Sequence, residues 1–385
     1  MREEDSKALI RLEESLNNLN TKNFTMFFFV VDCNNVPNGE MQYIYQLAKT
    51  LHDKNYNVKM IYQLENEYES HELEKLKKKD KPIDQNRIFN GVGEWLGEEY
   101  ASLPHMNIMK TEWKVTPSDF LFIPEAFSSL MKQTYHYKAP CKRIVILHNF
   151  NYVTDFIPFN DEWGTYGIKD CITTSSVQGD LIRSIFPYVN PIILRPYIDT
   201  CFRKPIEPKK LIVNVVSKNT VNVKKLIKMF YWKYPIYKFI TFRDLRGYPK
   251  ETFAEYLKES AITIWVDDET PFGYSALEAM KSGSIVIGKI PDIIPEWMKE
   301  ENGIRDNGIW SYDINLIPDI LSQVIGSWMQ DNFPETIYKE MENATKDYTY
   351  DNWLTNCDNV INTIIEDRKK EFEIVRENIN NNALK

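Results

Sequence analysis

A cluster of acidic side chains near residue 268 precedes a glycine-containing turn, as in many ligand-binding loops. Three consecutive carboxylates, Asp267–Glu269, precede a turn that contains Gly273. Clustered carboxylates of this kind can coordinate a divalent cation, which in turn can bind a diphosphate. Farther on, Ser275 and Glu278 fit the S-x-x-E capping box, in which the glutamate merely bonds a backbone N–H. The pattern therefore predicts either a ligand contact or a helix cap at Glu278.

The segment that carries these residues, Ala261–Trp297, has the hydrophobic pattern of a strand, a helix and a second strand. An apolar run comes first, a helix follows the turn, Gly283 ends the helix, and Ile285–Ile287 form the second apolar run. This is a βαβ unit. Ligands of open α/β sheets bind at the carboxyl ends of the strands, so we expect Asp267–Tyr274 to face a bound molecule.

The first half of the chain shows the same alternation. Met26–Val31 is apolar throughout, as in a parallel strand that is buried on both faces, and a turn with Gly39 follows it. After a helix, Asn57–Tyr62 predicts the next strand, and the later strand Ile144–Leu147 ends at His148. Gly39 and His148 are thus expected at the ligand-facing edge of a first sheet.

Two further segments are predicted to be helical and exposed. Leucines at positions 9, 12, 16 and 19 predict an amphipathic helix over residues 4–20. We expect it to pack on its own domain, with docking on a partner or a membrane as the alternative. The charged run Glu72–Lys81 is expected to be a solvated helix end, with binding of anionic lipid headgroups as the alternative.

The pattern divides the chain into two domains. The proline-bearing segment Arg203–Lys210 suits an interdomain linker, and strands alternate with helices again from Leu211. Asn352–Asn381 reads as one long helix. The predicted fold class is α/β, with two Rossmann-like doubly wound domains and a deep cleft between them. The predicted parts are a first domain at 1–203 with a leading helix at 1–22, a second domain at 204–348, and a helix at 349–385 that packs back toward the first domain.

Composition excludes several functional classes. A net charge of -8 argues against nucleic acid as the main partner, because phosphate binding depends on clustered Lys and Arg. The five cysteines are odd in number, far apart and without CxxC spacing, so neither a disulfide framework nor a zinc site is predicted. No apolar run is long enough to cross a bilayer, and the acidic start does not resemble a signal peptide. A cytoplasmic protein is expected, with peripheral contact at the inner face of the membrane left open.

Four segments resemble glycosyltransferases of the GT-B architecture, and retaining family 4 in particular. PFGYSALEAMKSGSIVIG, from Pro271, is similar to the family signature E-G-F-G-x-x-x-x-E-A-M-A-x-G-x-P-V-V. ILRPYID at Ile193–Asp199 is similar to the I-P-N-G-V-D segment, and RIVILHN at Arg143–Asn149 to a strand that ends in His. The turn at Pro37–Gly39 with its helix resembles the glycine-rich opening of the family.

The resemblance implies that the second domain binds a nucleoside-diphosphate sugar and that the acceptor meets the first. Glu278 would accept hydrogen bonds from the ribose hydroxyls. His148 would lie near the transferred sugar, and Gly39 would let the first-domain turn approach the donor phosphate or the acceptor. The other expected donor contacts are Thr270, Pro271, Phe272, Gly273, Tyr274 and Ser275. No cofactor or resident metal is implied, and a UDP-sugar is favoured over a GDP-sugar as donor.

The chain departs from the family pattern at one carboxylate. The family's first Glu, eight positions before the second, falls on Thr270, so Asp268 or Glu269 would have to substitute for it. A metal-free site also needs cations for the leaving diphosphate, because a helix N-terminus supplies only about 0.3–2 kcal/mol. Lys218 is the first candidate, both for catalysis and for donor binding, and Lys224 and Arg243 are further donor-side candidates.

The sequence therefore predicts a retaining, metal-independent hexosyltransferase that moves a sugar from a nucleotide donor to a hydroxyl of a glycan or a lipid-linked acceptor. Positioning and leaving-group electrostatics would supply most of the acceleration, and His148 and Lys218 are the expected catalytic residues. Two alternatives remain. One is a catalytically silent GT-B protein that binds nucleotide sugar or partners an active transferase, and the other is a different two-domain sugar-nucleotide enzyme such as an epimerase.

Overall fold

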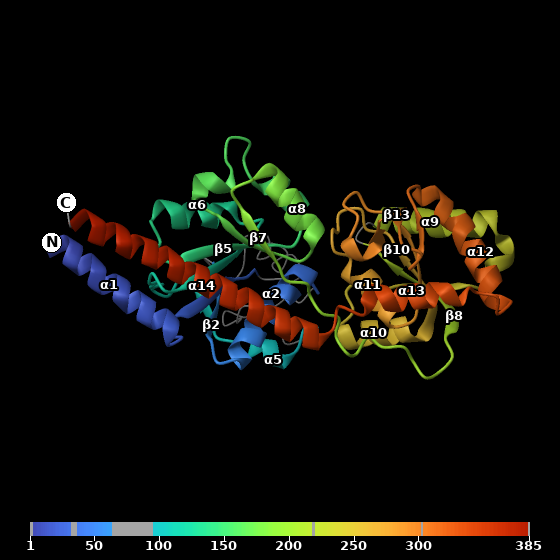
Figure 1. The fold of residues 1–385 in the computed structure, drawn as a ribbon. Coiled ribbons are helices and arrows are strands. Elements are labelled where there is room, and N and C mark those ends of the chain that lie inside the picture. Colours follow the sequence, from blue (N-terminus) through green and yellow to red (C-terminus); the bar gives the residue numbers. More distant parts are fainter. Residues whose placement is uncertain (1–2, 32–36, 64–94, 218–219, 302, 384–385) are drawn as a thin grey trace, which may run out of the picture.

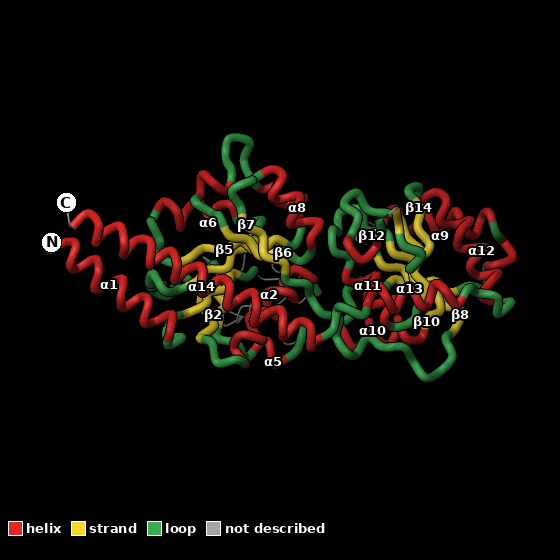
Figure 2. The backbone as a smooth tube through the Cα atoms, in the orientation of Figure 1, coloured by secondary structure: helices red, strands yellow, loops and turns green. Residues whose placement is uncertain are grey.

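A computed structural model describes residues 3–31, 37–63, 95–217, 220–301 and 303–383 (Figure 1). The charged run 72–81 and Lys218 lie outside these residues. Two parallel β-sheets, each flanked by helices, lie side by side along the molecule (Figure 2). Among the described residues, no helix is both long enough and apolar enough to span a bilayer.

The first domain is built on a seven-stranded parallel sheet in the order β3-β2-β1-β4-β5-β6-β7. Its strands are β1 Thr25–Phe29, β2 Asn57–Tyr62, β3 His105–Asn107, β4 Phe120–Pro124, β5 Lys142–Leu147, β6 Asp170–Thr173 and β7 Asn190–Ile193. Its helices are α2 Gly39–Asp53, α5 Glu98–Ala101, α6 Ser128–His136, α7 Phe150–Phe156 and α8 Ser176–Ile185, with the 3-10 helix η1 at Trp163–Tyr166.

The interior strand β1 is apolar on both faces because each face has its own core. Phe28 belongs to the core under α2 and stacks on Phe122, with ring centroids 4.4 Å apart. Its neighbours Phe27 and Phe29 belong to the opposite core, under α6, α7 and α8. Side chains alternate across a strand, so a run of phenylalanines supplies both cores and suits β1 to the interior of the sheet, between β2 and β4.

The second domain has a five-stranded parallel sheet in the order β14-β11-β10-β8-β9. Its strands are β8 Lys210–Val216, β9 Thr241–Asp244, β10 Ser260–Trp265, β11 Ile285–Lys289 and β14 Ile309–Ser311, beside a small antiparallel pair, β12 Lys299–Glu300 and β13 Gly303–Ile304. Its helices are α9 Thr220–Lys233, α10 Lys250–Glu259, α11 Tyr274–Lys281, α12 Ile317–Met329 and α13 Glu335–Thr345, with short 3-10 turns η2 Pro235–Tyr237, η3 Glu296–Met298 and η4 Ile314–Leu316.

Two terminal helices cover one face of the first domain. α14, Tyr350–Ala383, leaves the second domain and crosses to the first, where Trp353 donates a hydrogen bond to Thr50 (2.9 Å) and Asp358 pairs with Lys54 (2.7 Å). α1, Glu3–Asn20, runs beside α14, so the two termini lie at the same end of the molecule (Figure 1). Leu12 and Leu16 of α1 pack on the first core, which gives the amphipathic leader its apolar neighbour.

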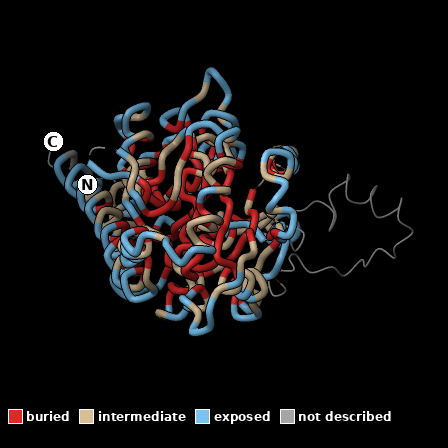
Figure 3. The backbone as a smooth tube through the Cα atoms, turned by 90° about the vertical axis from the view of Figure 1, so that its right-hand side faces the viewer, coloured by how far each residue is buried: buried red, intermediate tan, exposed pale blue. Residues whose placement is uncertain are grey.

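The change of domain comes earlier than the proline-bearing segment indicated. Leu194 and Tyr197 pack in the first core, whereas Ile198 and Phe202 pack in the second. The Ile198 N–H also donates to the carbonyl of Tyr348 (3.0 Å), so the two chain crossings run side by side. Buried residues fill the middle of the layers and the outer faces of the helices are exposed (Figure 3).

Candidate functional site

The turn between β10 and α11 requires a glycine. Gly273 caps α11 with φ of 75°, in the left-handed region that favours glycine. A Cβ there would lie 3.0 Å from the rings of both Trp265 and Trp297. The Trp297 indole also donates to the carbonyl of Phe272 (2.5 Å). Two buried tryptophans thus hold the turn so that the first N–H groups of α11 point to the carboxyl edge of the sheet.

Glu278 is a buried carboxylate without a hydrogen-bond or ion-pair partner among the described residues. It lies in the second turn of α11 and is 8% exposed. The capping-box alternative is wrong, because α11 begins at Tyr274 and Gly273, not Ser275, is its N-cap. Burial and, to a lesser extent, the nearby Asp199 raise the pKa of Glu278 to about 8, although Lys250 opposes the shift. A carboxylate held in this way is available to a ligand.

The charges nearest Glu278 come from the interdomain segment and from α10. Lys250 at the start of α10 pairs with Asp199 at 2.9 Å, and the Asp199 carboxylate also accepts the Cys201 N–H at 2.9 Å. Lys250 is therefore committed to Asp199 and does not neutralise Glu278. The sequence predicted no role for this pair, although Asp199 ends the quoted ILRPYID segment.

Tyr274 and Gly39 meet across the domains. A Cβ on Gly39 would lie 3.5 Å from the Tyr274 ring, which is ordinary contact. The Tyr274 hydroxyl is buried and has no hydrogen-bond partner among the described residues. Burial and the nearby Glu278 raise its pKa well above the ordinary value. Gly39 begins α2, whose N-cap Asn38 accepts from the N–H groups of Glu40 and Met41 (2.9 and 3.0 Å).

His148 is held by a glutamate that sequence analysis missed. Glu125, which follows β4, accepts from the backbone N–H of His148 (3.0 Å) and of Asn149 (2.6 Å), and its other oxygen lies 3.2 Å from Nδ1 of His148. Both side chains are buried, and the edge of the His148 ring faces the ring of Tyr43. Nε2 of His148 is buried and has no partner among the described residues. Its position after a buried strand was the one available signal for Glu125.

The acidic turn is tied to the first domain and to its own strand. The Nδ2 of Asn149 donates to the Glu269 carbonyl at 3.0 Å, across the cleft. Asp268 pairs with Lys289 at 2.5 Å, and the Thr270 hydroxyl donates to Asp267. Within the described parts of the chain, no three His, Cys, Asp or Glu side chains are grouped as metal ligands.

The predicted cations are not assembled around Glu278. Arg243 on β9 pairs with Glu259 at 2.9 Å and lies over the Tyr256 ring at 4.2 Å, where it joins β9 to α10. Lys224 is exposed on the outer side of α9. Lys218 lies outside the described residues. The structure thus gives Arg243 a structural role that the sequence did not predict, and it brings together Glu278, Gly273 and Tyr274 on one side with Gly39 and His148 on the other.

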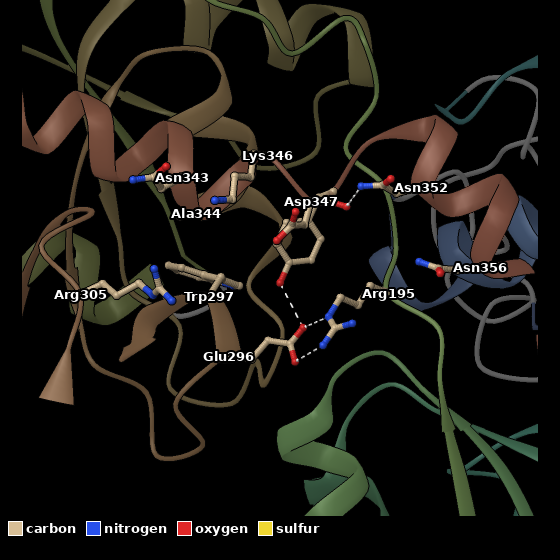
Figure 4. Close-up of a pocket in the computed structure, with 11 residues that line it drawn as sticks. Arg195, Glu296, Trp297, Arg305, Asn343, Ala344, Lys346, Asp347, Asn352 and Asn356 are labelled. Atoms are coloured by element: carbon tan, nitrogen blue, oxygen red, sulfur yellow. Dashed lines mark hydrogen bonds and ion pairs between the residues drawn. The ribbon is translucent and has the colours of Figure 1, made fainter. Parts of the chain in front are cut away.

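A second carboxylate, the partly buried Glu296 in η3, joins three parts of the chain (Figure 4). It pairs with Arg195, accepts from the backbone N–H and hydroxyl of Ser176 (3.0 and 2.8 Å), and accepts from the hydroxyl of Tyr348 (3.2 Å). Burial alone would raise its pKa, but Arg195 and Ser176 hold the pKa below the ordinary value. Glu296 therefore fastens the first domain and both crossings to the second domain.

A cavity of about 550 Å³ opens beside this carboxylate. Figure 4 shows Arg195, Asn352 and Asn356 on one side of it and Arg305 and Asn343 on the other. Trp297 also lines it, so the cavity lies on the far side of the indole that supports Gly273. It belongs to the flank of the domain junction, and neither Glu278 nor His148 lines it.

Comparison with known proteins identifies the architecture. The chain is 26% identical to an alpha-1,6-glucosyltransferase of Actinobacillus pleuropneumoniae serotype 7 (strain AP76), over 55% of this chain and 68% of that protein. The fold is similar to that of sucrose-phosphate synthase from Thermosynechococcus elongatus, with a TM-score of 0.58, 12% identity and coverage of 89% of this chain and 99% of the other. No protein-family model matches the chain.

Two more solved structures share the architecture. One is the pneumococcal O-GlcNAc transferase GtfA in complex with UDP and GlcNAc (TM-score 0.56, 9% identity, 92% of this chain and 99% of that one). The other is TarM (TM-score 0.55, 12% identity, 88% and 99%). The predicted GT-B fold class is confirmed, and so is the predicted class of enzyme, a glycosyltransferase.

Proposed function

We propose that the chain is a retaining, metal-independent hexosyltransferase that moves a sugar from a UDP-sugar to a hydroxyl of a glycan or a lipid-linked acceptor. The observation that carries the proposal is Glu278, a buried carboxylate without a partner beside a glycine-started helix. Ribose presents two neighbouring hydroxyl donors, which suit the two acceptor oxygens of one carboxylate. Support for the sugar nucleotide also comes from the similar fold of a transferase in complex with UDP.

The start of α11 suits the diphosphate. Gly273 has no side chain, so a ligand can approach the backbone at the start of the helix. The N–H groups of the first helical turn have no carbonyl acceptor within their own helix. The helix terminus supplies about 0.3–2 kcal/mol. Losing one well-aimed donor to a developing charge costs about 2.7–4 kcal/mol, so a cation is also required. We assign this part to Lys218, at the turn after β8.

His148 and Glu125 form the acceptor-side half of the proposed site. Glu125 can accept a hydrogen bond from Nδ1–H of His148. In this tautomer of the neutral imidazole the lone pair is on Nε2, which has no partner among the described residues. Such a group can accept a hydrogen bond from a sugar hydroxyl. His148 is therefore the proposed contact with the transferred hexose, and Glu125 is a positioning residue.

The silent nucleotide-sugar binder remains the second candidate because of Thr270. Its hydroxyl donates to Asp267, so it completes the turn and does not replace a carboxylate. Asp268 is neutralised by Lys289, and Glu269 is the remaining acid of the turn that could substitute for the family's first Glu. Transfer or hydrolysis of a UDP-sugar by the purified protein separates the two candidates, because a silent binder gives only thermal stabilisation.

Calorimetry with UDP and GDP tests the donor assignment. We expect Glu278→Ala to weaken UDP binding by about tenfold or more, because it removes two hydrogen bonds to the ribose, each worth about 0.5–1.5 kcal/mol. Glu251→Gln, an exposed carboxylate on the neighbouring α10, is the control and should bind UDP like the native chain. An unchanged UDP affinity in Glu278→Ala would remove the ribose assignment.

The role of Glu125 is tested by separating binding from turnover. Glu125→Gln keeps an acceptor for the N–H groups of His148 and Asn149 but removes the charge beside Nδ1. We expect kcat to fall about tenfold to hundredfold with UDP affinity unchanged, because the His148 ring has lost the carboxylate that orients it. Loss of UDP affinity with kcat unchanged would contradict a positioning role.

A further inference from the structure

One segment of this acidic chain is strongly basic. Residues 208–243 contain eight lysines, one arginine and no acidic residue, although the chain carries a net charge of -8. The segment covers β8, α9, η2 and most of β9. Charges farther away than about 8–10 Å are screened at physiological salt, so the local excess governs what this surface attracts.

The exposed face of α9 and η2 combines these lysines with large apolar side chains. Trp232 is 75% exposed, Ile236 76% and Phe239 61%. Lys228 and Lys225 lie about one and two turns before Trp232 on the same side of the helix, and both are exposed. The opposite side of α9, with Leu226 and Phe230, is buried in the core of the second domain. We call the exposed set, Lys225, Lys228, Trp232, Ile236, Lys238 and Phe239, the α9 face.

No acidic group in the described part of the chain neutralises the α9 face. Lys233, which is outside the face, pairs with Asp319 of α12 at 2.8 Å, and Lys225 donates to the side-chain oxygen of Asn315. Lys228 and Lys238 have no hydrogen-bond or ion-pair partner among the residues that the structure describes. Three positive charges therefore surround three exposed apolar side chains.

We propose that the α9 face docks on an anionic lipid bilayer. Trp and Phe are suited to the interfacial layer of a membrane, and lysines beside them are attracted to anionic headgroups. A nucleic acid fits less well, because the face has no arginine for bidentate phosphate contacts and presents an aliphatic side chain, Ile236, between its aromatic ones. The complementarity is that of a peripheral membrane contact.

The α9 face is remote from the candidate site. α9 and α12 lie at the end of the molecule opposite to the two termini (Figure 1). Its lysines are not those of the charged run 72–81, and none of its residues contacts Gly39, His148 or Glu278 in the structure. Docking does not depend on the proposed transferase activity, so the two can fail independently.

Co-sedimentation of the full chain with vesicles tests the proposal. Vesicles of phosphatidylcholine alone are compared with vesicles that also contain phosphatidylglycerol. We expect binding to the anionic vesicles only. Lys225→Gln/Lys228→Gln/Lys238→Gln should weaken it about hundredfold, because each lysine near the surface contributes roughly fivefold. Trp232→Ser/Ile236→Ser/Phe239→Ser should weaken it by about tenfold or more.

A matched control is available on the first domain. Tyr137 is 82% exposed and Phe159 is fully exposed, with Lys132 and Lys138 exposed nearby in the sequence. Tyr137→Ser/Phe159→Ser/Lys132→Gln/Lys138→Gln should sediment like the native chain. Equal loss in this control, or failure of the native chain to bind anionic vesicles, would overturn the proposal.

Fluorescence locates the contact on the chain. Brominated acyl chains should quench part of the tryptophan emission, and Trp232→Phe should abolish that quenching while it keeps vesicle binding. Quenching that persists in Trp232→Phe would place the contact on another surface and overturn the proposal. The far-UV circular dichroism spectrum and the unfolding midpoint of each variant should match those of the native chain, which shows that each variant is folded.

Discussion

Two glutamates of the second domain, the buried Glu278 and the partly buried Glu296, differ in what surrounds them. Both follow strands of the same sheet and both lie near the junction of the domains. Glu296 meets a guanidinium, a serine hydroxyl, a backbone N–H and a tyrosine hydroxyl, and its pKa is lowered. Glu278 has no such partner among the described residues, and burial raises its pKa to about 8.

The difference separates a structural carboxylate from one that is ready for a ligand. Burial is common to both, so burial alone does not identify a site. Burial of the Glu278 carboxyl group costs free energy of solvation, and no hydrogen bond from the described residues offsets this cost. Proteins retain such an unfavourable group where function requires it. Glu296, in contrast, stabilises the closed arrangement of the domains, because its partners come from α8, the interdomain segment and the crossing before α14.

The largest expected effect is on stability at alkaline pH in Glu278→Gln. The pKa of Glu278 is about 8 in the folded chain against 4.5 for an ordinary glutamate, so the folded state holds an extra proton between these values. Native stability therefore falls as pH rises from about 4.5 to 8. The neutral glutamine removes this loss, and we expect a gain on the order of a few kcal/mol at pH 9 and no gain at pH 4. Denaturant unfolding across pH measures it.

A matched variant controls for the chemistry of the substitution. Glu251→Gln replaces an exposed carboxylate on α10 and should leave the pH dependence as in the native chain. A gain in Glu278→Gln that is equal at pH 4 and pH 9 would show that the buried charge is not its cause. The same variant should lose UDP affinity, so stability and binding move in opposite directions.

Glu296→Gln is expected to give the opposite pH pattern and a smaller effect. Its folded pKa is depressed, so its stabilisation is present above about pH 4.5 and is lost as pH falls through the folded value. Because Arg195 is 40% exposed, we expect a loss of about 1 kcal/mol at pH 7, at the low end of the range for a charged hydrogen bond.

Hydrogen exchange at one amide gives the sharpest measurement. The Ser176 N–H donates to Glu296, so its exchange should accelerate in Glu296→Gln at pH 7. The Asn149 amide, which donates to Glu125 in the other half of the cleft, is the internal control. Equal acceleration of exchange at both amides would indicate a general separation of the two domains, and not the loss of the hydrogen bond between Ser176 and residue 296.

The fold could be predicted from sequence because its signals are local. The phenylalanines of β1 and the apolar run of β10 are long enough to mark strands, and Gly273 marks the turn that the tryptophans enforce. The packing of the chain changes from the first core to the second at Tyr197 and Ile198, before the proline-bearing segment Arg203–Lys210 that the sequence marks as a linker. An apolar, buried crossing has no such compositional signal.

The candidate site was predictable only in part, because the sequence does not show which distant residues become hydrogen-bond partners in the folded chain. Glu278 was found through a motif, but its lack of a partner could be seen only in three dimensions. Glu125 supports His148 from 23 positions away, and Glu296 joins Ser176 from 120 away. Arg243 illustrates the converse, since its position at a strand end gave no sign of its pairing with Glu259.

The smallest expected effect tests whether Tyr274, beside Glu278, already has its ligand-binding position in the free chain. A methyl group on Gly39 would touch the Tyr274 ring at 3.5 Å, and Gly39 does not need a positive φ. If Tyr274 is already fixed against the first domain, Gly39→Ala should change stability by less than about 0.5 kcal/mol and leave UDP affinity unchanged. Gly273→Ala is the contrast, because φ of 75° and two tryptophans at 3.0 Å should cost about 1–3 kcal/mol. A large loss of UDP affinity in Gly39→Ala would mean that Tyr274 moves when the donor binds, and the free carboxylate would then be a feature of the closed domains only.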